Sequence, residues 1–295
     1  MKRTLSLILA LFMTAALLAF LPSCASERKD ISTAKSIADL DGAKIAAQSG
    51  TFHAEAMKQI KNNTADTYPE FADLLTALKS GAIDGYIAEE PTALANCPAN
   101  TELDYLRLEN NNTAITATEK ETGVAIALAK GSALRAQINA VLATISEETR
   151  YALILQMADI SAGKTVESLA LTSETPAAPT GTLKIAMECA YAPYNWTDLN
   201  TPSLGAVPIY GEGGKVMEGR YANGYDVQIA LYVANKLGLK LEVYAYDWDS
   251  LVPAVQSGAV DAIVAGMSPT PDREEKVDFT DMYYVSNLVI IYKKK

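Results

Sequence analysis

The residues of this chain that are best suited to chemistry surround an arginine in the stretch "GMSPTPDR", which ends at Arg273. Thr270 is a good helix N-cap, and Pro271 and Asp272 suit a first turn, so a helix is predicted to begin there. Arg273 opposes the dipole of that helix, because a cation in the first turn faces its positive end. A bound anion would remove the conflict, and a carboxylate fits the planar guanidinium. A surface arginine paired with Glu274 or Glu275 accounts for the same residues equally well.

Two further positions could contact a charged ligand. In "SGTFHAEA", Ser49, Gly50 and Thr51 would open a helix with free N–H groups and a hydroxyl, which favours an anion. Glu89 follows another predicted strand, where its carboxylate could accept an ammonium group through charge-assisted hydrogen bonds. Plain helix capping is the alternative for the first feature, and a solvated pair of Glu89 with Glu90 is the alternative for the second.

Aromatic residues gather in the stretch "MECAYAPYNW", just past another predicted strand. Aromatic side chains at strand ends either line the apolar part of a ligand or pack against the protein. We expect Tyr194 and Trp196 to pack, and we expect Tyr191 and the more distant Trp248 to line a pocket. Glu188 directly precedes this cluster and would bring a carboxylate to the same edge.

The elements that must position these residues alternate between strands and helices, which predicts α/β units with mainly parallel sheets. In such sheets ligands bind beyond the carboxyl ends of the strands. Strands are predicted at 44–48, 83–88, 183–187, 239–244, 259–265 and 285–292, and helices at 51–61, 71–79, 226–237 and 251–256.

An internal similarity predicts two lobes of similar construction. The stretch "FADLLTALKSGAIDGYIA" from Phe71 aligns without a gap with "WDSLVPAVQSGAVDAIVA" from Trp248. Each describes a helix, a glycine turn and a buried strand, and convergence on this common unit is the alternative. A Ser-, Thr-, Pro- and Ala-rich stretch predicts a linker between the two halves. The expected division is 1–23 signal peptide, 24–35 tether, 36–163 first segment, 164–181 linker and 182–295 second segment.

The first residues predict export and anchoring. Lys2 and Arg3 precede an apolar run that ends in "LPSC", as in a signal peptide. The ending is similar to the lipobox of bacterial lipoproteins, which implies cleavage before Cys24 and lipid on its sulfur. An ordinary signal peptide or an uncleaved anchor is the alternative.

Composition excludes several classes of protein. The formal net charge of −10 makes the chain a poor nucleic-acid binder. The single histidine, His53, excludes a His-rich metal site. Cys97 and Cys189 are expected as two buried free thiols, with a disulfide as the alternative.

Several motifs together resemble the extracytoplasmic amino-acid-binding proteins of ABC transporters (family 3, periplasmic-binding-protein type II fold). The second segment, with "AYAPYNW", "YANGYDVQIALYVANKLGLKLE" and "DWDSLVPAVQSGAVDAIVAGMSPTPDREEKVDFTDMYY", is similar to the first half of these proteins. The first segment, with "SIADLDGAKIAAQSGT", "ALKSGAIDGYIAEEPTA" and "GVAIALAKGSALRAQINAVLATI", is similar to the second half. The resemblance implies two α/β lobes joined by hinge strands around a ligand cleft. It also implies an exchanged order of the halves, as in a circular permutation.

The same resemblance implies roles for the candidate residues. An amino acid, with a polar or cationic one favoured by Glu188, would be bound and passed to an ABC transporter permease outside the cell membrane. The expected binding residues are Arg273, Thr270 and Thr51 for the carboxylate, Glu89, Gly266 and Ser268 for the ammonium, Tyr191 and Trp248 on either side of the side chain, and Glu188 at its far end. No enzymatic activity, cofactor or metal is expected.

Two other functions stay open. Some proteins of this fold are dehydratases of prephenate-like acids, and Glu89 could act as their general acid or base. Against this, no histidine, nucleophile or second tuned acid is expected near Glu89. Alternatively, the chain is a half-cleft fragment that works only as an oligomer. A closed permuted monomer requires Lys295 near residues 30–37, and Glu89 facing Arg273 across one cleft.

Overall fold

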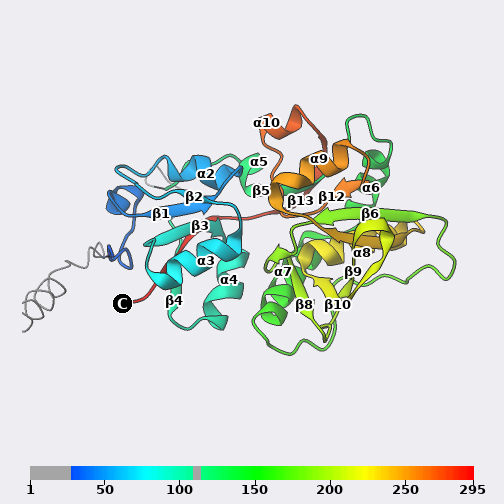
Figure 1. Cartoon of the computed structure of the whole chain (residues 1–295), viewed down its shortest axis with the longest axis horizontal. Coiled ribbons are helices and arrows are strands. Elements are labelled where there is room, and N and C mark those ends of the chain that lie inside the picture. The colour runs from blue at the N-terminus through cyan, green and yellow to red at the C-terminus, as the bar shows by residue number, and fades with distance from the viewer. Residues whose placement is uncertain (1–27, 109–113) are drawn as a thin grey trace, which may run out of the picture.

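The computed structural model describes residues 28–108 and 114–295, and Figure 1 shows two α/β lobes side by side. The small lobe comprises residues 28–108 and 288–295, and the large lobe comprises residues 123–285. The predicted class, α/β with two lobes, is confirmed. The signal peptide predicted over residues 1–23, the first part of the tether and Cys24 lie outside the described residues.

The small lobe contains a five-stranded sheet and several short helices. Its strand order is β2 (Thr67–Tyr68), β1 (Ile45–Gln48), β3 (Gly85–Glu89), β14 (Leu288–Lys293), β4 (Leu103–Leu106). The helical elements are η1 (Ile37–Leu40), α2 (Phe52–Met57), α3 (Phe71–Ser80) and α4 (Glu90–Ala99). Strands β1, β2 and β3 run parallel, whereas β14 is antiparallel to both of its neighbours.

Burial explains why these apolar runs form strands. All residues of β1 and β3 are buried, as expected for inner strands covered on both faces. Gly81 ends α3 in the left-handed conformation with φ of 81°, a common helix C-terminus. The helix predicted over 51–61 ends early, at Met57.

The large lobe contains a nine-stranded mixed sheet. Its strand order is β13 (Asp278–Val285), β5 (Gly123–Leu128), β12 (Ala262–Ile263), β6 (Thr182–Met187), β11 (Lys240–Ala245), β9 (Val207–Tyr210), β10 (Val216–Asn223), β8 (Asn195–Leu199), β7 (Ala190–Tyr191). The helical elements are α5 (Glu119–Thr122) at the boundary with the small lobe, α6 (Leu134–Leu142), α7 (Glu147–Ser161), η2 (Glu212–Gly214), α8 (Tyr225–Lys236), η3 (Trp248–Ser250), α9 (Leu251–Gln256) and α10 (Pro271–Glu274). The strand predicted over 259–265 is only two residues long.

The prediction of a single strand over 285–292 is wrong. The structure has two strands there, one in each lobe, and the chain crosses the hinge between them. Strand β13 ends at Val285 in the large lobe, and β14 begins at Leu288 in the small lobe. Ser286 and Asn287 cross between the lobes and form backbone hydrogen bonds on both sides. The Ser286 N–H donates to the Thr122 carbonyl at 3.1 Å, and the Glu90 N–H donates to the Asn287 carbonyl at 2.9 Å.

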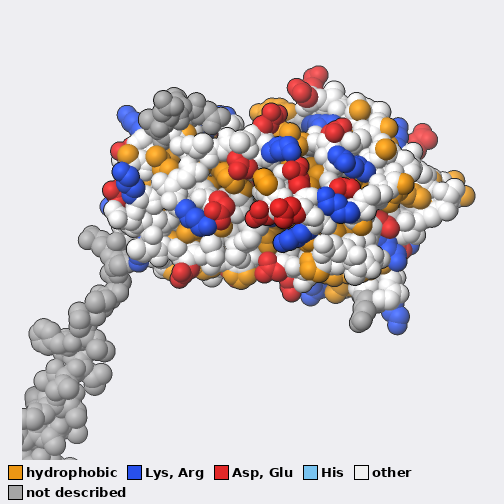
Figure 2. All heavy atoms as spheres, turned by 90° about the horizontal axis from the view of Figure 1, so that it is seen from above, with side chains coloured by type: hydrophobic (Ala, Val, Ile, Leu, Met, Phe, Trp, Pro, Cys, Tyr) orange, Lys and Arg blue, Asp and Glu red, His pale blue; other side chains and the backbone are white. Residues whose placement is uncertain are grey.

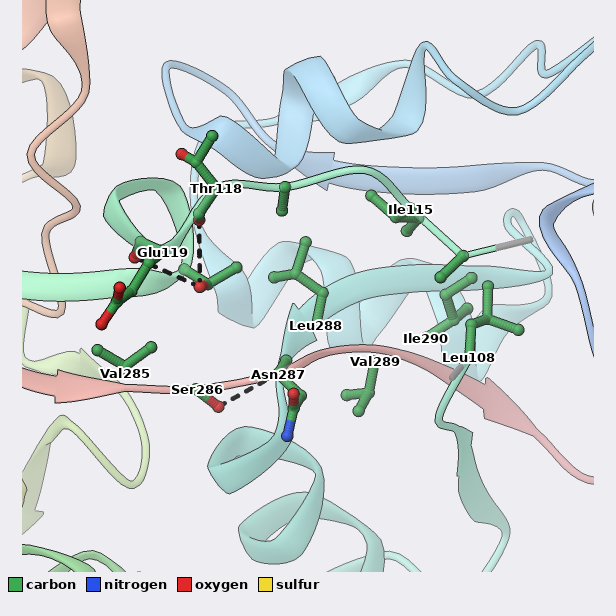
Figure 3. Close-up of a pocket in the computed structure, with 13 residues that line it drawn as sticks. Leu108, Ile115, Thr118, Glu119, Val285, Ser286, Asn287, Leu288, Val289 and Ile290 are labelled. Atoms are coloured by element: carbon green, nitrogen blue, oxygen red, sulfur yellow. Dashed lines mark hydrogen bonds between the residues drawn. The ribbon is translucent and has the colours of Figure 1, made fainter. Parts of the chain in front are cut away.

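A second crossing runs beside the first. The segment 114–122 leads from the small lobe into β5, and Figure 3 shows it lying alongside residues 285–290. The two crossings enclose a hinge cavity of mixed polar and apolar lining, with a volume of about 250 Å³. Its lining residues include Leu108, Ile115, Val285 and Leu288. The lobes are therefore joined by two crossing segments of the chain, the arrangement expected of hinged lobes.

The two ends of the described chain meet in the small lobe. Lys295 Nζ lies 3.4 Å from Asp30 Oδ2, and Arg28 Nη2 donates to the Lys293 carbonyl at 2.5 Å. This contact has the placement that a closed permuted monomer requires. The exchange of order itself stays a prediction.

The segment 164–181 lies on the surface of the large lobe in extended form. Leu171 is buried, Ser173 Oγ accepts a hydrogen bond from Asn235, and the Thr180 N–H donates to the Gly238 carbonyl. Cys97 and Cys189 are free thiols, and Cys189 is buried while Cys97 is half-buried. None of the helices within residues 28–108 and 114–295 has the length and apolarity needed to cross a membrane.

Candidate functional site

A small cavity between the lobes brings most of the candidate residues together. Its volume is about 10 Å³, roughly the space of one water molecule, so the cleft is closed around its own side chains. The small lobe contributes Gln48, Thr51, Phe52, His53, Phe71 and Glu89, and the large lobe contributes Tyr191, Trp248, Gly266, Ser268 and Arg273.

Arg273 reaches across the cleft from the start of α10. Its Nη1 donates to the Ser268 carbonyl at 3.0 Å, and its Nη2 donates to the Gly50 carbonyl of the other lobe at 2.7 Å. Its guanidinium lies 5.1 Å from the ring centroid of Trp248, within cation–π distance. Burial lowers the pKa of Arg273 to about 10, so the side chain remains charged at neutral pH.

Two glycines shape the walls of the cleft, one in each lobe. Gly50 has φ of +67° and supplies the carbonyl that Arg273 contacts. Gly266 has φ of +60°, and a Cβ there would lie 3.2 Å from the ring of Tyr191. Both positions are left-handed, where a side chain would be strained, so both turns favour glycine.

Glu89 forms an ion pair with His53 in the same cavity. His53 Nε2 lies 3.2 Å from Glu89 Oε1, and both side chains are buried. Glu89 is the last residue of β3, and His53 lies in the first turn of α2. The expectation that no histidine lies near Glu89 is therefore wrong, because parallel strands β1 and β3 bring the residues that follow them to the same edge.

Stacked aromatic rings fill the space next to this pair. Phe71 lies on Tyr191 with ring centroids 3.9 Å apart and 12° between their planes. The His53 ring meets Phe71 edge-on at 5.9 Å. Tyr194 is fully buried behind Tyr191, so its predicted packing role matches its position. Tyr191 thus contacts Phe71, while Trp248 contacts Arg273.

Glu188 does not line the cavity itself, but it contacts Gln48, which does. Its Oε1 accepts a hydrogen bond from Gln48 at 3.2 Å, and its Oε2 has no hydrogen-bond partner among the described residues. Burial, together with the neighbouring carboxyl group of Glu70, raises the pKa of Glu188 to about 9. At neutral pH this closed cleft therefore holds Glu188 as a neutral carboxyl group.

A wider groove opens outside the closed cavity. It has a volume of about 650 Å³ and lies between α2 of the small lobe and η3 and α10 of the large lobe. Figure 2 looks onto this face, where acidic and basic side chains are interspersed across the middle of the molecule. Thr51, Trp248 and Arg273 line both the cavity and the groove, so the groove is the outer part of the same cleft.

Ser268 connects the cavity to the hinge. Its hydroxyl donates to the Glu121 carbonyl at 3.1 Å, at the end of the segment shown in Figure 3 that crosses between the lobes. A ligand that engages this hydroxyl would therefore compete with a contact of the hinge.

Of the nine residues predicted to bind a ligand, seven line the closed cavity. Thr270 instead lines the outer groove as the N-cap of α10, and Glu188 is linked to the cavity through Gln48. Sequence reasoning missed four lining residues, namely Gln48, Phe52, His53 and Phe71. Gln48 ends β1, and Phe52 and His53 follow it. The only signal in the sequence for any of the four was that His53 is the single histidine of the chain.

The cleft presents one positively charged and one negatively charged side chain, each from a different lobe. A guanidinium from the large lobe and a carboxylate from the small lobe line the same small space. Oε2 of Glu89 and the hydroxyl of Tyr191 have no hydrogen-bond partner among the described residues. This arrangement is chemically suited to a ligand that carries both an anionic and a cationic group. Within the described residues, no group of three or more His, Cys, Asp and Glu side chains could hold a metal ion.

Comparisons with known proteins match the C-terminal part of the chain. Residues 215–295 match the model of the bacterial extracellular solute-binding proteins, family 3. The arginine-binding extracellular protein ArtP of Bacillus subtilis (strain 168) is 44% identical over 77 residues, or 26% of this chain and 30% of the relative. The L-cystine-binding protein TcyA of the same organism is 32% identical over 114 residues, or 39% of this chain and 35% of the relative.

The chain thus spans about a third of the length of the curated relatives it matches. Among solved structures, an ancestral arginine-binding protein bound to arginine is 33% identical, with a TM-score of 0.26. That match covers 35% of this chain and 37% of the other.

Proposed function

We propose that this chain binds a free amino acid outside the cell. Its residues 215–295 resemble the family 3 bacterial extracellular solute-binding proteins. In this proposal it delivers the amino acid to the permease of an ABC importer. The curated relatives include amino-acid-binding proteins, among them a probable amino-acid ABC transporter-binding protein from Haemophilus influenzae.

One observation carries the proposal. Arg273 and Glu89 line a single cleft from opposite lobes, and Glu89 Oε2 lacks a hydrogen-bond partner among the described residues. The zwitterionic backbone of an amino acid has a carboxylate for Arg273 and an ammonium for Glu89. Both contacts are charge-assisted and would be made only when the two lobes enclose the ligand.

The neighbouring acids favour a cationic amino acid. Glu188 and Glu70 interact at one end of the cleft, and Glu188 keeps an unpartnered oxygen. A guanidinium or ammonium group at the end of a ligand side chain would favour the charged form of Glu188 and offset its repulsion from Glu70. Gln48, which already donates to Glu188, would orient that carboxyl group.

Calorimetric titration with the twenty amino acids tests the function. One class, with arginine or lysine expected first, should bind with micromolar or tighter affinity. Arg273→Ala should weaken binding by at least about 100-fold, because a carboxylate left unpaired in a closed cleft is costly. Arg220→Ala, at an exposed arginine of β10, is the matched control and should bind as the native chain does. No heat with any amino acid would reject the proposal.

We also propose the finer points of location and assembly. The protein would be held to the membrane by lipid on Cys24, and it would act as a monomer whose halves are exchanged relative to the family. The contact between Lys295 and Asp30 supports this connectivity. Mass spectrometry of the protein purified from membranes, compared with a Cys24→Ser variant, would detect the lipid.

A second candidate function follows from the ion pair in the cleft. A buried carboxylate beside an imidazole could act as a general acid or base, so His53 and Glu89 favour a dehydratase of prephenate-like acids over other enzymes. Incubation with prephenate or arogenate and analysis of the products separates this candidate from a binding protein. Turnover lost in Glu89→Gln would favour the enzyme.

A further inference from the structure

His53, the single histidine of the chain, occupies the place where the proposed ligand needs a free carboxylate. Its Nε2 is 3.2 Å from Glu89 Oε1, and the residue is only 5% exposed. Its Nδ1 has no hydrogen-bond partner within the described residues, and neither has Oε2 of Glu89. The pair is thus shielded from solvent, and each member keeps one unused polar atom.

The charged surroundings of this pair come from both lobes. Arg273 and Tyr191 reach the cavity from α10 and β7, and the edge of Phe71 covers the imidazole from α3. Behind Glu89 lie Asp226 of α8, whose pKa burial raises to about 6, and the hydroxyl of Tyr194. The charged groups beside His53 on its own helix and its C-cap are Glu55 and Lys58, which pair with each other at 2.6 Å in solvent. Glu89 is therefore the acid that directly contacts the imidazole.

A ligand ammonium and an imidazolium would compete for this carboxylate. Glu89 is buried, so its charge is stable when a cation is in contact with it. A second cation beside the first would repel it at short distance in a poorly solvated site. The site can therefore hold a protonated His53 or a ligand ammonium, but holding both is unfavourable.

We propose that His53 competes with the amino group of the ligand for Glu89, so that capture of an amino acid releases a proton from His53. The inference rests on the proposed amino-acid binding and adds a residue that sets its proton dependence. In the ligand-free cleft, a protonated His53 would donate its Nε2–H to Oε1 of Glu89. In the complex, the ligand ammonium takes the place of that group.

The direction of the pH dependence follows from this exchange. The ligand-free protein binds more protons than the complex, so lowering the pH favours the ligand-free protein. Affinity should therefore fall as the pH falls through the range where histidine titrates, between about pH 8 and 5, by up to tenfold per pH unit. Delivery into an acidic environment would favour release.

The test is calorimetry with L-arginine at pH 6 and pH 8, in buffers of different ionisation enthalpy. The native chain should bind about tenfold or more weakly at pH 6 and should release a proton on binding. His53→Gln should bind equally at both pH values and release none. Lys58→Gln, at the exposed C-cap of the same helix, is the matched control and should behave as the native chain does.

The outcomes separate this inference from the proposed function. Binding by the native chain with the same affinity at both pH values and no proton release overturns the inference alone. No binding of arginine by either protein at either pH overturns the inference together with arginine as its ligand, and the titration with the other amino acids then decides the function. Binding by His53→Gln but not by the native chain supports the inference, because the imidazole of the native chain then occupies Glu89 and prevents the ligand from binding to it.

A second measurement needs no variant. The chain has one histidine, so its imidazole resonances are assigned without ambiguity. Arginine should move the NMR titration of His53 in the native chain to lower pH. An unchanged titration in the arginine-saturated protein overturns the inference even if His53→Gln fails to fold.

Discussion

At the scale of single residues, Glu188 at one end of the cleft should determine how the free energy of unfolding depends on pH. Burial raises the pKa of Glu188 to about 9, so the folded closed form binds a proton that the unfolded chain releases near pH 4.5. The free energy of unfolding should therefore fall as the pH rises from about 5 to 9. Glu188→Gln should remove this loss and stabilise the protein at pH 8 by on the order of 1–3 kcal/mol.

Denaturant unfolding at pH 5, 7 and 9 without ligand measures this effect. Glu218→Gln, at an exposed glutamate of β10, is the matched control and should keep the pH dependence of the native chain. Equal unfolding free energies for Glu188→Gln and the native chain at all three pH values would contradict a buried neutral Glu188.

Residue chemistry predicted part of the cleft from the sequence. Arg273 was found because a cation breaks the dipole rule at a helix start, and Glu89 because it ends a strand. The contact of His53 with Glu89 could not be predicted, because it depends on how far α2 leans over the end of β3. The stacking of Phe71 on Tyr191 likewise depends on the closure of two lobes.

At the scale of elements, strand β14 should be essential for the small lobe. It lies between β3 and β4, and Ile291 is fully buried there. Ile291→Ala should lower the free energy of unfolding by about 2–5 kcal/mol, because it leaves a cavity in the centre of a sheet. Hydrogen exchange should show the loss of protection in β1 and β3, although residue 291 follows the large lobe in sequence.

Val216→Ala, at a valine that is 54% exposed on β10, is the control and should change the unfolding free energy little. Loss of protection confined to the large lobe would contradict the assignment of β14 to the small lobe.

Periodicity predicted the strands and helices that carry the site, but not the break at Ser286 and Asn287. The run over 285–292 was predicted as one strand because of its apolar residues, although the polar pair Ser286 and Asn287 interrupts it where its partners change from β5 to β3. Strands β7 to β10 were missed because their residues mix polar and apolar types without a clear period.

At the scale of the whole molecule, a rearranged chain tests the proposal that the two halves are exchanged. A chain in which residues 182–295 are followed directly by residues 28–163 joins Lys295 to Arg28, which the structure already places close together. It should fold into the same two lobes, remain a monomer in light scattering and bind the same amino acid with similar affinity.

A second rearranged chain, opened in the middle of β11, is the control and should fail to fold, because it cuts a strand paired on both sides. If the first rearranged chain binds no amino acid while the native chain does, the two halves are not simply exchanged.

The position of β14 also determines the order in which the lobes are completed as the chain is made. All strands of the large lobe have been synthesised by residue 285, so that lobe can fold early. Residues 28–108 of the small lobe precede the large lobe in the sequence, yet the sheet of the small lobe lacks an inner strand until residues 288–293 emerge. Its exposed β3 and β4 edges must stay unpaired throughout synthesis, which makes the first-made half the last to fold and the part most dependent on protection from aggregation.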